Sequence, residues 1–166
     1  LGIILEYHSK KDSMLKDERK SFLKEKEAEN KKPSKVSVGF IGGGNFASRT
    51  LIPAFSNTSS ELETLVTTSG ISSFVNAKKN GLRVASTNIE DILSNEKINT
   101  VVISTRHNLH ATQVISSLEA GKNIYVEKPL ALKLQELDEI EKTYSKNKAS
   151  LNLMVGFNRR FSPFTT

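Results

Sequence analysis

The pattern of apolar and polar residues changes at about residue 35. After that point, short apolar runs rich in β-branched residues alternate with segments in which apolar residues recur every three or four positions. The first pattern is typical of buried strands, and the second is typical of amphipathic helices. Strands are therefore expected at residues 36–41, 62–67, 82–85, 100–104, 123–127 and 151–156. Helices are expected at residues 45–55, 74–80, 89–93 and 110–120, and around Leu134, Leu137, Ile140 and Tyr144.

This alternation predicts the fold class. We expect an α/β protein with a doubly wound, Rossmann-type parallel sheet of about six strands and helices on both faces. The centre of the 100–104 segment is fully apolar, as expected for a strand covered on both sides. Pro53 is expected to shorten or kink the first helix, whose inward residues should be Leu51, Ile52, Ala54 and Phe55.

The first 35 residues are expected to form an arm or linker. Residues 2–7 predict a short strand with no local partner, and residues 11–32 predict a charged helix with a thin apolar stripe. Mixed charge of this kind is typical of a solvated connector, and a helix that binds a partner is the alternative. Because the chain begins with Leu1 and stops after Thr166 without a closing element, we expect a piece of a longer protein in which residues 36–166 form one domain.

Composition and charge argue against several classes of protein. The 166 residues include no cysteine, which excludes disulfides and thiolate metal sites and fits a reducing, cytoplasmic location. No apolar run approaches the roughly 20 residues that span a bilayer, so no membrane partner is expected. The net charge of +6 is spread along the chain, with 10 basic and 7 acidic side chains in residues 1–35 and 14 and 11 in residues 36–166. Without a basic stripe or interleaved aromatic residues, this excess argues against a nucleic-acid partner.

A glycine-rich turn follows the first expected strand and opens the first helix. Its residues are Gly42, Gly43, Gly44, Asn45, Phe46 and Ala47, which satisfy the pattern G-x-G-x-x-G/A. The first glycine of this pattern permits a tight turn, and the second lets the backbone approach a pyrophosphate at the helix N-terminus. The position of this motif between a strand and a helix predicts dinucleotide binding, and a purely structural glycine turn is the alternative.

The end of the second strand bears on the identity of the cofactor. An acidic residue there would hold a ribose 2′-hydroxyl, but this chain has Thr67, Thr68 and Ser69, with nothing acidic between Glu63 and Glu90. Hydroxyls and backbone N–H groups can bind a 2′-phosphate, although no basic residue follows before Lys78. We therefore expect NADP or NAD, with NADP slightly favoured, and another segment could set the choice.

Polar clusters also follow the later strands, at the edge where ligands of such sheets bind. After residues 100–104 come Thr105, Arg106, His107, Asn108 and His110; after residues 123–127 come Lys128 and Pro129, next to Glu127; after residues 151–156 come Asn158 and Arg159. His107 and His110 could share a metal on one helix face, but no carboxylate or third histidine is nearby, so no metal is expected. Lys128 could bind a substrate hydroxyl or relay a proton, or it could belong to a surface ion pair.

Taken in order, these motifs resemble the N-terminal domain of the glucose–fructose oxidoreductase / inositol dehydrogenase (Gfo/Idh/MocA) family. The resemblance covers about residues 36–166 and rests on the glycine turn, on Glu127-Lys128-Pro129 and on the run at residues 156–161. It implies hydride transfer between a nicotinamide cofactor and a sugar, cyclitol or nucleotide-sugar hydroxyl. Lys128 would be the catalytic lysine, Pro129 would follow a cis bond, and the residues expected to line the nicotinamide side are Thr105, His107, Asn108 and His110.

The resemblance also has limits. The substrate domain of the family is missing, so the chain should bind a cofactor without turnover, and any homo-oligomer would form through that absent domain. A non-catalytic dinucleotide-sensing module is the alternative, against which the intact Glu127-Lys128-Pro129 triplet counts. Some runs look closest to a subgroup fused to a zinc-type alcohol-dehydrogenase-like module, whose tail would be residues 3–7. Lys133 stands where a helix-capping Ser or Thr is usual, at a cost of about 1 kcal/mol.

Overall fold

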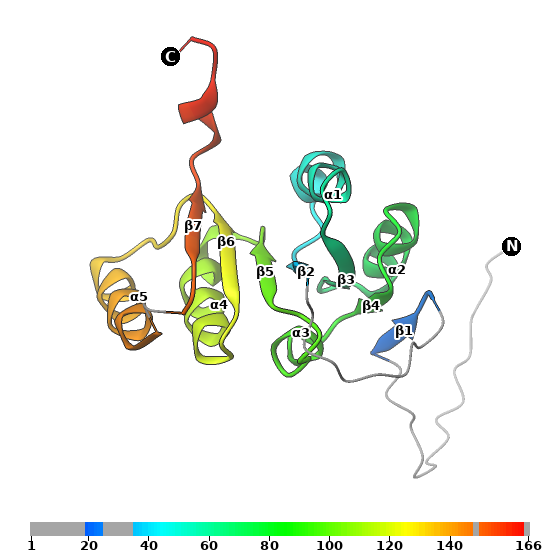
Figure 1. Cartoon of the computed structure of the whole chain (residues 1–166), viewed down its shortest axis with the longest axis horizontal. Helices are drawn as coiled ribbons and strands as arrows, with labels where there is room; N and C mark the ends of the chain where they lie inside the picture. Colours follow the sequence, from blue (N-terminus) through cyan, green and yellow to red (C-terminus); the bar gives the residue numbers. More distant parts are fainter. Residues whose placement is uncertain (1–18, 25–34, 148–149, 165–166) are drawn as a thin grey trace, which may run out of the picture.

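The computed structural model describes residues 19–24, 35–147 and 150–164. The strand expected at residues 2–7 and most of the charged helix expected at residues 11–32 lie outside these ranges. Figure 1 shows a twisted sheet with helices on both faces. Its strands are β1 (Lys20–Phe22), β2 (Ser37–Ile41), β3 (Glu61–Val66), β4 (Val84–Ser86), β5 (Thr100–Ile103), β6 (Asn123–Glu127) and β7 (Leu153–Gly156). The helical segments are η1 (Ala47–Leu51), α1 (Ile52–Ser56), α2 (Gly70–Lys79), α3 (Glu90–Leu93), α4 (His107–Glu119), α5 (Leu134–Asn147) and η2 (Asn158–Phe161).

The strand order confirms the expected fold class. The sheet runs β1-β4-β3-β2-β5-β6-β7, and every pair from β4 to β7 is parallel. Counted from β2, this is the doubly wound order 3-2-1-4-5-6. The chain reverses its direction of winding between β2 and β5, so a crevice is expected at the carboxyl ends of these two strands.

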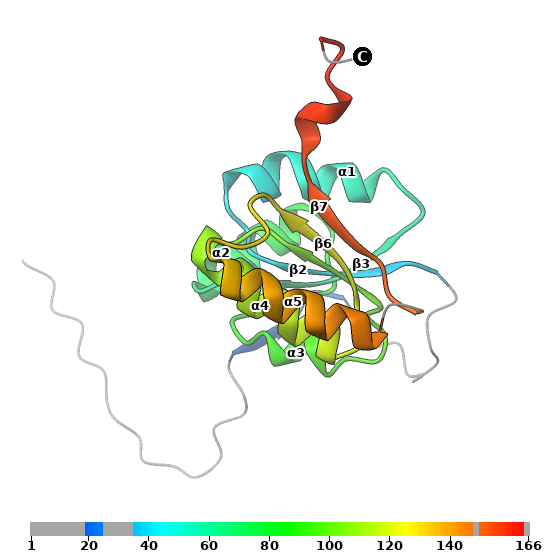
Figure 2. The same ribbon diagram turned by 90° about the vertical axis from the view of Figure 1, so that its left-hand side faces the viewer.

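Alternating side chains of the central strands supply two cores, one on each face of the sheet. Phe40 of β2 packs with Ile52 of α1 and Ala77 of α2, whereas Ile41 belongs to the core formed with α3, α4 and α5. Figure 2 shows α4 and α5 side by side across one face and α1 above them on the other side of the sheet. Because helices cover both faces of the sheet, the sequences of the central strands are nearly continuous apolar runs.

The edge strand β1 corrects the part of the helix expected at residues 11–32 that falls within residues 19–24. Lys20–Phe22 form a strand that pairs antiparallel with β4, with Ser21 opposite Ala85. β4 would otherwise end the sheet with unpaired N–H and C=O groups, and these groups favour an added strand over a solvated helix turn. Within the described residues the sheet therefore has seven strands, one more than the six or so expected.

Several helices differ from expectation at their ends or in their inward faces. The helix expected at residues 45–55 is the π-type turn η1 followed by α1, with Pro53 in the first turn of α1. A π-type turn has more residues per turn than an α-helix, so the residues that follow it point in different directions from those of a regular α-helix. As a result, Ala54 is exposed instead of facing the sheet. α2 and α4 begin four and three residues earlier than expected, at Gly70 and His107.

The outermost helix, α5, buries less than its pattern suggests. Ile140 is buried and Tyr144 packs beside it, whereas Leu134 and Leu137 are 78% and 43% exposed. At the start of α5, the carboxylate of Glu136 accepts hydrogen bonds from the N–H groups of Leu132 and Lys133, at 2.9 and 3.1 Å. This is the reciprocal half of a capping box, and it offsets the missing Ser or Thr at position 133.

Within the described ranges, no helix is long and apolar enough to cross a membrane.

A buried lysine stabilises the edge of the sheet where strands β5 and β6 begin. The Lys122 ammonium donates to the carbonyl oxygens of Asn95 and Ile98, at 2.8 and 2.7 Å, and only 6% of the residue is exposed. Burial lowers the pKa of Lys122, and the charge of Glu96 partly opposes this effect. The ammonium therefore stabilises the turn before β5 mainly through its two hydrogen bonds to the carbonyl oxygens of Asn95 and Ile98.

Replacing this lysine should destabilise the fold. Lys122→Met keeps the apolar stem but leaves two carbonyl oxygens without their donor, and we expect a loss of about 2 kcal/mol in the free energy of unfolding. Urea denaturation measures this loss. The control is Lys79→Met, an exposed position in α2 where a change within about 0.5 kcal/mol is expected. Equal stability of the two variants would contradict the stabilising role of Lys122.

Candidate functional site

Two cavities lie at the carboxyl ends of the strands, one on each side of the glycine turn. We call them the β3-side cavity, of about 820 Å³, and the β6-side cavity, of about 790 Å³. Both volumes are typical of sites for cofactors and small ligands. Gly44, Ser104 and Thr105 line both cavities, so the two are halves of one groove that crosses the switch point between β2 and β5.

The glycine turn is held tightly on one side and open on the other. Gly42 has φ +103°, its N–H donates to Val66 O at 2.9 Å, and an added Cβ would lie 2.6 Å from the Ser104 oxygen. A Cβ at Gly43 would lie 2.8 Å from Thr67 Cγ2, whereas one at Gly44 would meet nothing within 4 Å. Gly44 therefore faces the open groove, where a ligand group that binds the backbone of the turn would lie.

A side chain from α2 fixes the orientation of this turn. The Asn76 amide donates to the Gly43 carbonyl oxygen at 3.2 Å. With the Gly43 carbonyl tied back toward α2 and Ser48 N–H bonded to Gly44 O at 2.9 Å, the free N–H groups at the start of the helical segment remain available for an anion.

The lining of the β3-side cavity combines apolar side chains with several hydroxyl side chains and contains no acidic residue. Thr67 and Ser69 come from the end of β3 and the start of α2, and the Thr67 hydroxyl donates to Ser69 O at 2.7 Å. Across the cavity lie the loop after β4 and the start of α4. The full lining is Ile41, Gly42, Gly43, Gly44, Val66, Thr67, Thr68, Ser69, Ser72, Thr87, Asn88, Ile89, Ser104, Thr105, Arg106, Leu109 and Gln113.

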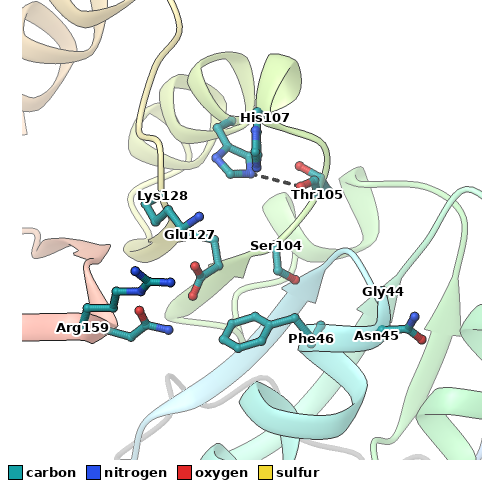
Figure 3. Close-up of a pocket in the computed structure, with 12 residues that line it drawn as sticks. Gly44, Asn45, Phe46, Ser104, Thr105, His107, Glu127, Lys128 and Arg159 are labelled. Atoms are coloured by element: carbon teal, nitrogen blue, oxygen red, sulfur yellow. Dashed lines mark hydrogen bonds between the residues drawn. The ribbon is translucent and has the colours of Figure 1, made fainter. Parts of the chain in front are cut away.

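The β6-side cavity collects the charged side chains. Figure 3 shows Lys128, Glu127 and Arg159 directed toward one space, with the ring of Phe46 below them. Lys128 is exposed to this space, and its peptide bond to Pro129 is cis, as the family resemblance implies. The full lining is Gly44, Asn45, Phe46, Ala47, Ser104, Thr105, His107, His110, Glu127, Lys128, Asn158 and Arg159.

The Glu127 carboxylate is oriented by its neighbours. The Tyr125 hydroxyl donates to Glu127 Oε1 at 3.0 Å, and the Tyr125 ring packs edge-on against Phe55. Burial and the contact with Glu127 raise the pKa of Tyr125 to about 12, so the phenol remains a donor throughout the neutral range. A Cβ at Gly156 would lie 2.8 Å from the same carboxylate oxygen, so the glycine leaves room for this arrangement.

His110 joins the two loops that border the β6-side cavity. The residue is fully buried, with Nδ1 at 2.7 Å from Pro129 O and Nε2 at 3.2 Å from Thr105 O. Each ring nitrogen thus lies within hydrogen-bond distance of a backbone carbonyl oxygen, and the tautomer decides which oxygen accepts the ring N–H. This position gives His110 a structural role, while its contact with a cofactor stays a prediction. No group of three or more potential metal ligands occurs in the part of the chain that the structure describes.

Most of the residues expected at a site meet in this groove. The exceptions are Asn108 and Pro129, which line neither cavity; the Pro129 carbonyl instead contacts His110. The groove also includes residues that the sequence did not single out: Ser72, Thr87, Asn88, Ile89 and Gln113. The loop after β4 could have been found by the same rule of carboxyl strand ends, but Gln113 comes close only because α4 passes Thr105, whose hydroxyl donates to it at 2.6 Å.

Comparison with known proteins agrees with this geometry. A family model described as an oxidoreductase family with an NAD-binding Rossmann fold matches residues 36–157. A 1,5-anhydro-D-fructose reductase from Ensifer adhaerens is 30% identical over 102 residues, which cover 61% of this chain and 31% of that protein.

Solved structures are similar over a comparable range. A candidate myo-inositol dehydrogenase from Sinorhizobium meliloti 1021 has a TM-score of 0.69 at 30% identity, over 78% of this chain and 38% of that one. The scyllo-inositol dehydrogenase from Lactobacillus casei, solved with NAD(H) and scyllo-inositol, has a TM-score of 0.71 at 21% identity over 78% and 38%, a likeness of fold alone. The chain spans less than half the length of each of these relatives.

Two glycine variants should separate folding from ligand binding. Gly44→Val places its side chain in open space, so the free energy of unfolding should change little while affinity for a dinucleotide falls at least about 100-fold. Gly42→Ala combines a positive φ with a backbone clash, so it should lose about 2 kcal/mol or more of stability. Denaturation and calorimetric titration measure both effects. Micromolar binding by Gly44→Val would contradict the assignment of the turn.

Proposed function

Since the chain belongs to the Gfo/Idh/MocA oxidoreductase family with an NAD-binding Rossmann fold, we propose that its groove binds NAD or NADP. The observation that carries this proposal is the open side of Gly44 at the centre of a continuous groove. A pyrophosphate would lie at Gly42–Gly44, where backbone N–H groups at the start of a helical segment attract an anion.

The lining of each cavity supports one orientation of the ligand. The adenosine half would occupy the β3-side cavity, because the end of the second parallel strand is where such folds bind the ribose. The nicotinamide half would occupy the β6-side cavity, which places its ring near Lys128 and His107. The residues proposed to contact the cofactor are those expected from the sequence, with Thr87, Asn88 and Gln113 added on the adenosine side.

A bound nicotinamide would supply or accept hydride at a substrate carbon. We propose that the substrate is a sugar, cyclitol or nucleotide sugar that reacts at a hydroxyl. The names of the relatives, a 1,5-anhydro-D-fructose reductase and a candidate myo-inositol dehydrogenase, support the first two classes. Lys128 would hold the reacting oxygen with its ammonium and exchange a proton with it, since its side chain is exposed to the cavity instead of paired within it. Arg159 and Asn158 would orient the substrate from the C-terminal side of the same cavity.

The chain alone should bind a cofactor without turning over a substrate. It spans 31% of the reductase relative and 38% of the aligned dehydrogenase structures, and Arg159, which lines the β6-side cavity, is exposed. We propose that a substrate domain completes this cavity in the whole protein. On the sequence resemblance alone, we also propose that a zinc-type alcohol-dehydrogenase-like module precedes residues 1–35.

Replacing Lys128 should affect chemistry rather than cofactor binding. In the longer protein that carries the activity, Lys128→Ala should lower kcat at least about 100-fold, because it removes the group that exchanges a proton with the substrate oxygen. In the 166-residue chain, the same change should leave the affinity for NADPH or NADH within about threefold. Stopped-flow or steady-state kinetics and calorimetry provide the two readouts. Unchanged turnover would refute the role of Lys128.

The residue after β3 should control the choice between the two cofactors. Thr67→Asp places a carboxylate where it can bind a ribose 2′-hydroxyl and repel a 2′-phosphate, so the ratio of NADPH to NADH affinity should fall about tenfold or more. Thr67→Asn, which has the same shape without charge, is the matched control and should leave the ratio nearly unchanged. Equal ratios in both variants would place cofactor selection in another segment.

A further inference from the structure

The β1 segment contacts the loop that lines the adenosine side of the groove. This segment, residues 19–24, precedes the part of the chain that the family model matches. Beyond its pairing with β4, it extends along the start of the β4–α3 loop, where the Thr87 N–H donates to Arg19 O at 3.1 Å. Thr87, Asn88 and Ile89 of that loop line the β3-side cavity, so one loop faces β1 on one side and the groove on the other.

A short chain of polar contacts links Lys20 to the same loop. The Lys20 ammonium lies 3.0 Å from Asp91 Oδ1, and the other oxygen of Asp91 accepts a hydrogen bond from the Ser86 hydroxyl at 2.5 Å. That hydroxyl oxygen accepts the Asn88 N–H at 2.9 Å. The conformation of residues 86–88 therefore depends on the Asp91 carboxylate, whose charge is balanced by Lys20 of β1.

Burial makes this ion pair more than a surface contact. The side chains of Lys20 and Asp91 are 27% and 16% exposed, so removal of the lysine would leave a mostly buried carboxylate without a counter-charge. Such a group either acquires water or shifts its position, and both changes would release the Ser86 hydroxyl that orients the loop. The β1 backbone also fixes Thr87, so the two contacts act on consecutive residues.

We propose that β1, through Lys20, positions the β4–α3 loop for the adenosine half of the dinucleotide. Docking of β1 and binding of the cofactor are then coupled, and by linkage each strengthens the other by the same factor. This inference rests on the proposed function, since the ligand is the dinucleotide assigned to the groove. Lys20 is a positioning residue here, because it acts through Asp91 and the loop and lines neither cavity.

The chain offers a matched control for Lys20. Lys24 lies at the other end of the same segment, and its ammonium donates to Gly81 O at 2.5 Å. Gly81 lies in the turn between α2 and β4 and lines neither cavity. Lys20→Met and Lys24→Met therefore remove the same charge from the same segment, but only Lys20 is connected to the groove.

The test combines a measurement without ligand and a measurement with ligand on the full chain. In the ligand-free protein, amide hydrogen exchange at Thr87 and Asn88 should be about tenfold faster in Lys20→Met and within about twofold of the original rate in Lys24→Met. Calorimetry should then show about a fivefold or greater loss of affinity for NADPH and for ADP-ribose in Lys20→Met alone.

The outcomes separate this inference from the proposed function. Equal exchange at Thr87 and Asn88 in the two variants would overturn the positioning role, whatever the ligand affinities are. Faster exchange with unchanged affinity for both ligands would overturn the coupling. Absence of NADPH and ADP-ribose binding by the unmodified chain would instead overturn the proposed function, and the coupling with it.

Discussion

The backbone approach between the end of β2 and the start of the β5–α4 loop is the constraint on which the site depends. Gly42 adopts a positive φ with no room for a Cβ against Ser104 O, and the Ser104 hydroxyl donates to Gly42 O at 3.1 Å. This contact brings the carboxyl ends of the two central strands together at the point where the sheet reverses its winding. It also turns Gly44 outward, so the same geometry that closes the fold opens the groove.

The two halves of the groove are held in place by different means. On the β3 side, hydroxyl and amide side chains fix the loops: Asn76 of α2 binds the glycine turn, and Ser86 holds the start of the β4–α3 loop through Asn88. On the β6 side, the buried ring of His110 joins the Thr105 loop to the Pro129 turn, and Tyr125 orients the Glu127 carboxylate. Lys128 is left exposed between these supports, which suits a group that must reach a substrate oxygen.

The fold and the centre of the site follow from local patterns. Apolar runs identify the parallel strands because each strand is buried on both faces. The glycine turn identifies the crevice because this glycine spacing, directly after a strand, is typical of dinucleotide-binding turns. β1 could not be predicted, since Lys20–Phe22 has no apolar alternation and forms a strand only against the free edge of β4. The same holds for Ala54, whose orientation depends on a π-type turn, and for Gln113, which reaches the groove only through the packing of α4.

Calorimetric titration of the unmodified chain with NADPH and with NADH tests the central claim most directly. The groove and the open side of Gly44 predict saturable binding of one equivalent with a dissociation constant in the micromolar range for at least one of the two. A chain that is folded by circular dichroism but binds neither dinucleotide at millimolar concentration would contradict the assignment of this groove.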